Sequence, residues 1–214
     1  MCGICGIVDY NSGSSVNETL LRKMCAELRH RGPDDEGVFL NRNNPLIGLG
    51  HRRLSIIDLS PSGHQPIFNE DGSACIVFNG EIYNFHELRS LLEEKGHIFK
   101  SHTDSETIIH LYEEHGEDCV KFLRGMFAFA IWDEKQKILF LARDRVGKKP
   151  LIYSYNNGVF CFASEFLSLL KSGLIKKDIN YQAIDCYLTF GYIPAPQTIY
   201  KDVFKLAPGS RLIL

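Results

Sequence analysis

The sequence predicts an α+β fold in which antiparallel sheets pack against helices. The predicted strands and helices follow one another in blocks, without the regular strand–helix alternation of a parallel sheet. Two pairs of β-rich runs are joined by short turns at 133–136 and 156–158, which is typical of antiparallel hairpins. The run 126–132, MFAFAIW, is apolar throughout and predicts a strand covered on both faces.

The spacing of apolar residues places five helices. From Val16 to Leu28 apolar residues recur at helical spacing, after a capping-box pattern at Ser15 and Glu18 and before Gly32-Pro33. Similar patterns predict the other helices at 85–96, 104–115, 164–172 and 181–189.

Runs rich in β-branched and aromatic residues place the strands. Residues 38–59 are expected to form strands interrupted by an Asn/Pro loop at 41–45, and residues 75–78 a short strand after the turn at Asp71-Gly72. The remaining predicted strands are 126–132, 138–142, 151–155, 159–163 and 211–214.

Charge and hydropathy exclude several classes of function. The chain has 214 residues, with 24 Lys and Arg against 26 Asp and Glu, and a formal net charge of −2. A nearly neutral chain has no electrostatic reason to bind nucleic acid or anionic lipid. No apolar run approaches the ~20 residues of a membrane-spanning helix, and the N-terminus lacks the pattern of a signal peptide. We therefore expect a cytoplasmic protein with no nucleic-acid or membrane partner.

The chain has seven cysteines, an odd number at irregular spacing, which predicts free thiols rather than a disulfide framework. Four have apolar neighbours and are expected in the core: Cys25, Cys75, Cys161 and Cys186. Cys2 and Cys5 form a CxxC motif, but a structural zinc site needs four ligands. Four histidines are spaced five to eight residues apart, too far to share one helical face in pairs: His97, His102, His110 and His115. We therefore predict no metal site.

Cys2 is of interest because of its position. After removal of Met1 it would carry both a thiol and a free α-amine, whose ordinary pKa values are about 8.5 and about 7.7–8.0. Such a residue combines a nucleophile with its own general base. The alternative is an ordinary frayed N-terminus, and Cys2 alone does not exclude it.

Arg52 and Arg53 stand at a predicted strand start. Adjacent strand residues point to opposite faces, so at most one of the two faces any given site. A guanidinium there would bind a carboxylate through two hydrogen bonds, and the alternative is a solvated strand edge.

Asn79-Gly80 is a strong hairpin signal, but a helical pattern rather than a strand follows it. An Asn amide and a Gly backbone N–H aimed at one point would instead form an oxyanion hole. Glu81 and Asp104 could hold a ligand ammonium opposite an arginine, although Asp104 also suits a helix cap. An amino acid, with one carboxylate and one ammonium, fits this set of residues.

Taken together, these residues resemble class II glutamine amidotransferases, and above all the glutaminase domain of glutamine-hydrolysing asparagine synthetases. The matching stretches are collinear and cover nearly the whole chain: 2–6 (CGICG), 29–34 (RHRGPD), 51–58 (HRRLSIID), 63–66 (GHQP), 78–84 (FNGEIYN), 103–106 (TDSE), 123–130 (LRGMFAFA) and 142–150 (ARDRVGKKP). Each is weak alone, but their ordered combination is specific.

The resemblance implies a role for individual residues. Cys2 would be the nucleophile and its own α-amine the base, which requires removal of Met1 because an amide nitrogen is not basic. Asn79 and Gly80 would stabilise the oxyanion, and Arg53 would bind the α-carboxylate of glutamine. Four further residues would complete the pocket. Glu81 and Asp104 would face the α-ammonium, and backbone groups near Ile56 and Ile57 would line it.

The resemblance also implies a fold and a partner. The fold would be the four-layer αββα sandwich of N-terminal nucleophile hydrolases, with two antiparallel sheets, and residues 1–214 would form one glutaminase domain. The ATP-dependent synthetase domain that amidates aspartate is expected to be absent from this chain. ATP and Mg²⁺ would belong to that domain, this chain would need no cofactor, and 142–150 would border the route of ammonia. A homodimer is left open.

Three alternatives remain at this point. The first is a different acceptor for the ammonia, as in surface-polysaccharide pathways. The second is a non-catalytic module that binds glutamine or a partner domain. A CxxC metal or redox module is the third alternative, and it lacks partner ligands.

Overall fold

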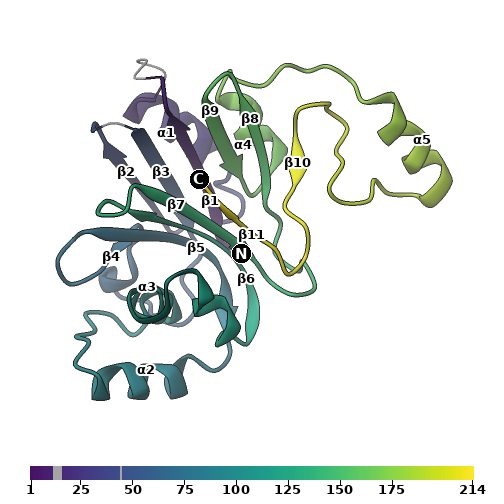
Figure 1. Cartoon of the computed structure of the whole chain (residues 1–214). Helices are drawn as coiled ribbons and strands as arrows, with labels where there is room; N and C mark the ends of the chain where they lie inside the picture. The colour runs from purple at the N-terminus through teal and green to yellow at the C-terminus, as the bar shows by residue number, and fades with distance from the viewer. Residues whose placement is uncertain (12–15, 44) are drawn as a thin grey trace.

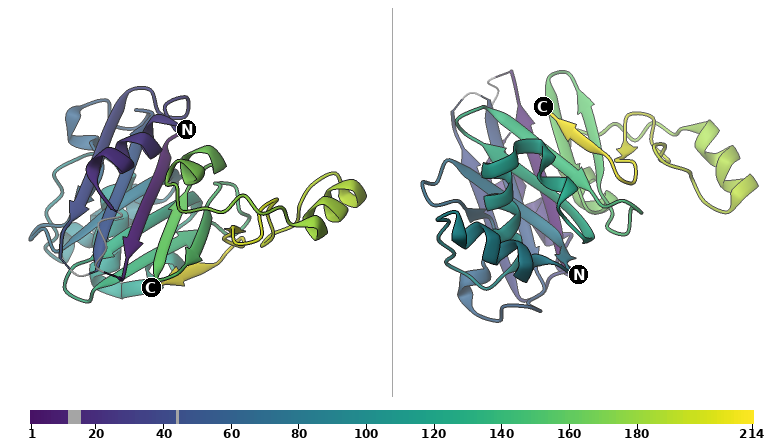
Figure 2. Two further views of the ribbon diagram at one scale, coloured as in Figure 1. Left: turned by 90° about the horizontal axis from the view of Figure 1, so that it is seen from above. Right: turned by 60° about the horizontal axis from the view of Figure 1, so that its bottom comes forward.

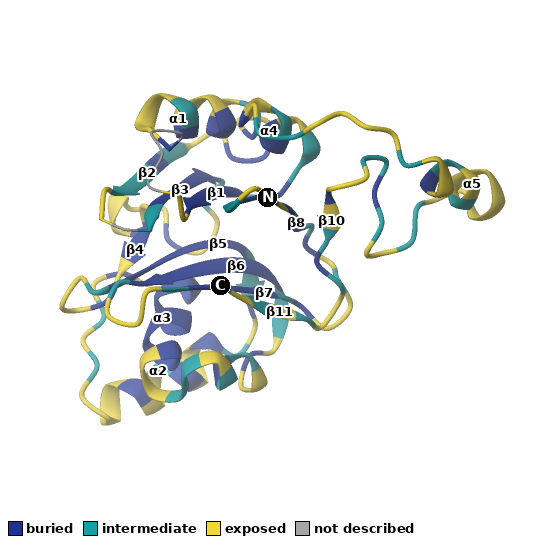
Figure 3. Cartoon of the chain, turned by 45° about the horizontal axis from the view of Figure 1, so that its top comes forward, coloured by how far each residue is buried: buried dark blue, intermediate teal, exposed yellow. Residues whose placement is uncertain are grey.

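The computed structural model describes residues 1–11, 16–43 and 45–214. Two antiparallel sheets are stacked face to face, and helices cover the outer face of each (Figure 1; Figure 3). Three apolar clusters lie between the successive layers: between α1 and α4 and the first sheet, between the two sheets, and between the second sheet and α2 and α3. The predicted α+β sandwich with an αββα order of layers is confirmed.

The first sheet has six strands in the order β10-β8-β9-β1-β3-β2, and neighbouring strands are antiparallel. Its strands are β1 (Gly3–Asp9), β2 (Asp35–Asn41), β3 (Leu46–Arg53), β8 (Ile152–Asn156), β9 (Val159–Ala163) and β10 (Phe204–Lys205). β1 is central and fully buried, so the residue before it, Cys2, is held at one end of the sheet.

The second sheet has five strands in the order β11-β7-β6-β5-β4, again all antiparallel. Its strands are β4 (Ile67–Phe68), β5 (Ala74–Ile82), β6 (Gly125–Asp133), β7 (Ile138–Arg143) and β11 (Arg211–Ile213). The strand predicted at 126–132 is covered on both faces, as expected. Its Phe127, Phe129 and Ile131 face the helices, and Ala128, Ala130 and Trp132 face the first sheet.

Helices α1 (Glu18–Ala26) and α4 (Phe166–Lys171) pack on the first sheet, and α2 (Phe85–Glu94) and α3 (Asp104–His115) on the second. The side chain of Asn17 caps α1 by accepting a hydrogen bond from Leu20 N. The predicted cap at Ser15 lies outside the described residues. Helix α5 (Tyr181–Phe190) stands away from the sandwich in both views of Figure 2. No helix in the described ranges is long and apolar enough to cross a membrane.

Several predicted boundaries are wrong. Residues 54–59 form an irregular loop with a bend at 56–57 instead of a strand, so Arg52 and Arg53 stand at a strand end. Strand β5 continues through Asn79-Gly80 to Ile82, because β6 supplies a partner along its whole length. Residue 44 of the predicted loop at 41–45 lies outside the described residues.

Sequence patterns missed the strands β1, β4 and β10 and two short 3₁₀ helices, at Pro61–Gly63 and Gly116–Lys121. β1 was missed because it is buried on both faces and rich in Gly and Cys, so it does not alternate between apolar and polar residues. All seven cysteines are free, and Cys25, Cys75 and Cys161 are buried as predicted. Cys186 is only half-buried, contrary to the prediction, because α5 lies outside the core.

Candidate active site

A cavity of about 140 Å³ opens at the end of the sandwich where Cys2 enters β1. It is lined by the N-terminus, the loop after β3, the end of β5 and the start of α3. All eight residues predicted from the sequence line it: Cys2, Arg53, Ile56, Ile57, Asn79, Gly80, Glu81 and Asp104. A volume below the roughly 300–1,000 Å³ of drug-sized sites suits a small molecule such as an amino acid.

The thiol of Cys2 lies against the backbone of Leu54. Leu54 N–H donates a hydrogen bond to Cys2 Sγ at 3.4 Å, and Sγ lies 3.7 Å from Leu54 O. Burial raises the pKa of the Cys2 thiol, while the Leu54 N–H, the terminal amine and Arg53 act in the opposite direction. The thiol therefore needs a base close by to become a nucleophile near neutral pH.

Met1 precedes Cys2 and is 56% exposed. Its α-amine is the chain terminus, and partial burial lowers the pKa of that amine. In this form the nitrogen of Cys2 belongs to a peptide bond and is not basic. The exposure of Met1 leaves it open to removal by an aminopeptidase.

Asn79 and Gly80 belong to the final part of β5, where the strand runs beside the cavity. The Asn79 side chain shares the face of Cys75 and Val77, which points toward the first sheet, and it lines the same cavity as Cys2. It is 0% exposed, and within the described ranges neither its amide nitrogen nor its amide oxygen has a hydrogen-bond partner. A buried unpaired amide costs stability, so its presence in a cavity wall points to a ligand that completes it.

The backbone N–H of Gly80 also points away from its sheet partner. Gly80 is paired with Phe127, but the N–H and C=O of Phe127 bond to Asp144 on the other side, at 3.2 and 2.8 Å. In an antiparallel pair, both residues then direct these groups outward. On the same edge of β5, Phe78 N–H donates to Gln65 Oε1 and Ile82 N–H donates to Asp104 Oδ2. Gly80 therefore presents its N–H at the edge that lines the cavity.

Arg53 contributes a guanidinium to the cavity wall. Its guanidinium donates to the carbonyl oxygens of Ser60, at 2.9 Å, and Asp58, and no carboxylate of the described residues lies within ion-pair distance. Arg52 points to the opposite face, where it pairs with Glu36 at 2.8 Å. As expected for adjacent strand residues, at most one of the two arginines faces the site, and it is Arg53 that lines the cavity.

Glu81 and Asp104 add two carboxyl groups to the lining of the cavity. Asp104 Oδ2 accepts a hydrogen bond from Ile82 N–H at 2.8 Å. Burial raises the pKa of Asp104 to about 6, and the charge of Glu81 acts in the same direction. One unpaired arginine and two acids suit a ligand that carries both a carboxylate and an ammonium.

Sequence reasoning did not assign several residues that build the site. Arg31 Nε donates to the carbonyl oxygen of Cys2 at 2.9 Å, and its Nη1 pairs with Glu165 at 2.7 Å. Gly63 makes room for Arg53, since a Cβ at this position would lie 2.0 Å from Arg53 Nη2. Lys149 also lines the cavity. All three belong to stretches that carry the family resemblance, at 29–34, 63–66 and 142–150. No local sequence pattern shows what these residues contact.

Comparison with known proteins agrees with this geometry. Residues 1–214 match the profile of a family described as glutamine amidotransferase domain. A putative asparagine synthetase [glutamine-hydrolyzing] 2 of Methanocaldococcus jannaschii is 43% identical over 233 residues, covering 100% of this chain and 44% of the relative. Asparagine synthetase [glutamine-hydrolyzing] 1 of Bacillus subtilis is 39% identical over 218 residues, covering 100% of this chain and 33% of the relative. The chain thus spans less than half the length of these relatives.

Solved structures share the fold. A glutamine phosphoribosylpyrophosphate amidotransferase from B. subtilis superposes with a TM-score of 0.63 at 20% identity, over 80% of this chain and 44% of that one. An allosteric regulatory enzyme of purine biosynthesis superposes with a TM-score of 0.70 at 19% identity, over 99% of this chain and 46% of that one. At these identities the likeness concerns the fold alone.

Proposed function

The chain belongs to the class II glutamine amidotransferase domain family, and we propose that its cavity hydrolyses the side-chain amide of glutamine through a covalent intermediate on Cys2. The observation that carries the proposal is Asn79. A fully buried amide without a partner in the described residues lines the same cavity as a cysteine thiol. This is the arrangement that an oxyanion in acyl transfer requires.

The proposed reaction begins with Cys2 after removal of Met1. The α-amine accepts the proton of the thiol, and Sγ attacks the side-chain carbonyl carbon of glutamine. The negative charge that develops on the carbonyl oxygen is stabilised by the Asn79 amide and the Gly80 N–H. The amine then returns the proton to the leaving nitrogen, and ammonia departs from a γ-glutamyl thioester. Water attacks the thioester and releases glutamate and the thiol.

Substrate binding uses charged groups of both signs in the lining of the cavity. Arg53, which lacks a carboxylate partner in the described residues, binds the α-carboxylate of glutamine, and Glu81 and Asp104 bind the α-ammonium. Ile56 and Ile57 also line the cavity, and their backbone groups would contact the bound glutamine. Gripping both charged groups of the amino acid leaves its side-chain amide directed at Cys2.

We propose that the ammonia serves an ATP-dependent synthetase domain that converts aspartate to asparagine. The names of the relatives and their greater length support this partner. The chemistry proposed for the present residues uses no cofactor, and ATP and Mg²⁺ would act in the synthetase domain. A different acceptor would leave the glutaminase half unchanged.

The test is glutamate release from glutamine by chain from which Met1 has been removed, as verified by intact mass. We expect Cys2→Ala to abolish it, and Cys186→Ala, which removes a thiol far from the cavity, to retain it. Quenching during turnover should trap a mass increase of one glutamyl group on the parent chain and none on Cys2→Ala. Glutamate release by Cys2→Ala at the parent rate would refute the proposal.

A further inference from the structure

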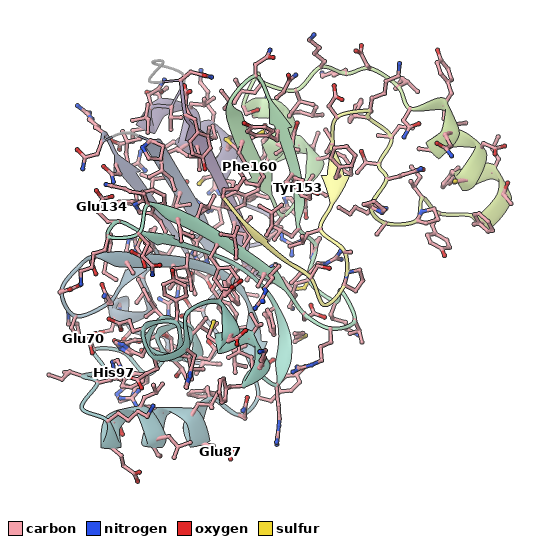
Figure 4. All side chains as sticks on the ribbon, in the orientation of Figure 1. Glu70, Glu87, His97, Glu134, Tyr153 and Phe160 are labelled. Carbon is pink, nitrogen blue, oxygen red and sulfur yellow. The ribbon has the colours of Figure 1, made fainter. Side chains whose placement is uncertain are left out.

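A second group of chemically active side chains lies among the helices that cover the outer face of the second sheet. We define the His–Glu cluster by its four members: Glu70, His97, His110 and Glu113. Glu70 follows β4, His97 lies between α2 and α3, and the other two are on α3, three residues apart and therefore on one face. Figure 4 shows Glu70 and His97 next to each other beside α3. None of the four lines the Cys2 cavity.

The donor atoms of the cluster converge on one point. One nitrogen or oxygen from each residue lies within 4.8 Å of all the others. His97 Nδ1 lies 3.1 Å from Glu70 Oε1 and 3.7 Å from Glu113 Oε2. His110 Nδ1 lies 3.4 Å from Glu70 Oε2 and 2.9 Å from Glu113 Oε2. In a tetrahedral zinc site with bonds of about 2.0–2.2 Å, neighbouring ligand atoms are about 3.3–3.6 Å apart. The four histidine–carboxylate distances, from 2.9 to 3.7 Å, bracket this spacing, with Glu70 facing His97 through Oε1 and His110 through Oε2.

The histidine rings are held with Nδ1 directed at the carboxylates. The His110 side chain is 1% exposed. Its Nε2 has no hydrogen-bond partner in the described parts of the chain, and Glu106 Oε1 lies 3.9 Å from it. His97 Nε2 lies 3.3 Å from Glu114 Oε1. When Nε2–H donates to Glu114, the neutral ring presents the Nδ1 lone pair to two carboxylates, which is repulsive unless a cation lies between them. A carboxylate on the far nitrogen is the usual outer partner of a metal-bound histidine.

The carboxylates are oriented by further contacts. Asn69 Nδ2 donates to Glu113 Oε1 at 2.7 Å, which leaves Oε2 directed at the histidines. Ile98 N–H donates to Glu70 Oε1 at 3.2 Å. Lys95 pairs with Glu114 and not with the cluster, so the described ion pairs place no lysine or arginine on Glu70 or Glu113.

We propose that the His–Glu cluster is a zinc site. Imidazole nitrogens and carboxylate oxygens are ordinary Zn²⁺ ligands, and two of each complete a tetrahedron. With four protein ligands no position is left for water or substrate, so the zinc is structural. It joins the β4–β5 turn and the α2–α3 loop to α3, whose first turn carries Asp104 at the cavity. The ligands come from three segments, which explains why histidine spacing alone did not predict the site.

The competing explanation is a set of ordinary ion pairs with protonated histidines and no metal. Zinc is titrated into the metal-stripped 214-residue chain, and binding is measured by calorimetry and by elemental analysis. This experiment separates the zinc site from the metal-free ion pairs. We expect one zinc per chain and a higher thermal midpoint with zinc. Co²⁺ should give the intense visible bands of a four-coordinate site. Absence of stoichiometric zinc would overturn the proposal.

Variants locate the metal. His97 is 13% exposed, so His97→Ala should fold, and we expect it to weaken zinc affinity by more than about 100-fold, beyond the 10–100-fold typical of an outer-shell change. Glu113→Gln, which keeps the shape of the side chain, should act similarly. His86→Ala, at an exposed histidine outside the cluster, and Cys5→Ala, which breaks the CxxC motif, should bind zinc normally. Zinc that is retained by His97→Ala but lost in Cys5→Ala would place the metal at the CxxC motif and refute the cluster.

Discussion

The backbone N–H of Leu54 donates a hydrogen bond to Cys2 Sγ across 3.4 Å. This bond favours the thiolate, but burial of the same sulfur raises the pKa of the thiol. A single N–H is weaker than the loss of solvation, so the protein environment alone does not ionise Cys2. A base that takes the proton during attack is required, and only removal of Met1 creates one on Cys2 itself.

We therefore expect glutaminase activity to depend on the state of the N-terminus. Chain that retains Met1 should release no glutamate above background, because its Cys2 nitrogen is an amide. Treatment with an aminopeptidase should raise the rate in proportion to the fraction that begins at Cys2, measured by intact mass. Full activity in chain that retains Met1 would exclude the α-amine as the base.

Asn79→Ala should lower kcat by about 10²–10³-fold with little change in KM, since its amide meets the carbonyl oxygen only as charge develops. Its stability should change little, because no hydrogen bond within the described residues is lost. Asn84→Ala is the matched control. It loses bonds to Phe122 O and Arg124 N, at 3.0 and 2.9 Å, and should unfold more easily while keeping kcat. Equal kcat values for Asn79→Ala and the parent would rule out the oxyanion role.

Arg53→Lys should raise the KM for glutamine by about 10- to 100-fold, because one point charge replaces a guanidinium that bonds a carboxylate in two places. Steady-state kinetics at saturating glutamine should show a much smaller change in kcat. Arg52→Lys provides the comparison, since Arg52 faces Glu36 on the other side of the strand. If both variants changed KM equally, neither would be assigned to the substrate carboxylate.

Asp104→Asn should make the free protein more stable at pH 7.5 while weakening glutamine binding. The pKa of Asp104 is raised from 3.8 to about 6, so the folded chain holds this proton more tightly than the unfolded chain. The ionised carboxylate therefore costs stability above pH 6, by up to about 3 kcal/mol, and the full stability returns below pH 4. Asparagine removes that charge and can still accept the Ile82 N–H.

Urea unfolding at several pH values tests this expectation. The difference between Asp104→Asn and the parent should be largest above pH 6 and disappear near pH 4. Asp185→Asn, which changes an exposed carboxylate on α5, should show no such dependence. A variant that is less stable than the parent at pH 7.5 would mean that Asp104 forms a net stabilising interaction there.

Much of the fold follows from local pattern. The apolar run at 126–132 predicts β6 and its burial on both faces, and the two hairpins and five helices are recovered within a few residues. The failures share a cause. β1 does not alternate because it is central, and Asn79-Gly80 continues a strand because β6 lies beside it. In each case a partner distant in sequence overrides the local preference.

The sequence by itself singled out the residues of the proposed site, since an N-terminal cysteine, an arginine, two acids and an Asn-Gly pair stand in the same order as in the family that the chain resembles. Only the tertiary structure decided how they meet. It brings the eight predicted residues into one cavity, directs Arg53 inward and Arg52 outward, and gives Arg31 to the Cys2 carbonyl. It also assembles the His–Glu cluster from three segments. Local pattern reports the periodicity of burial, whereas the direction of a side chain across stacked sheets depends on contacts between residues far apart in the chain.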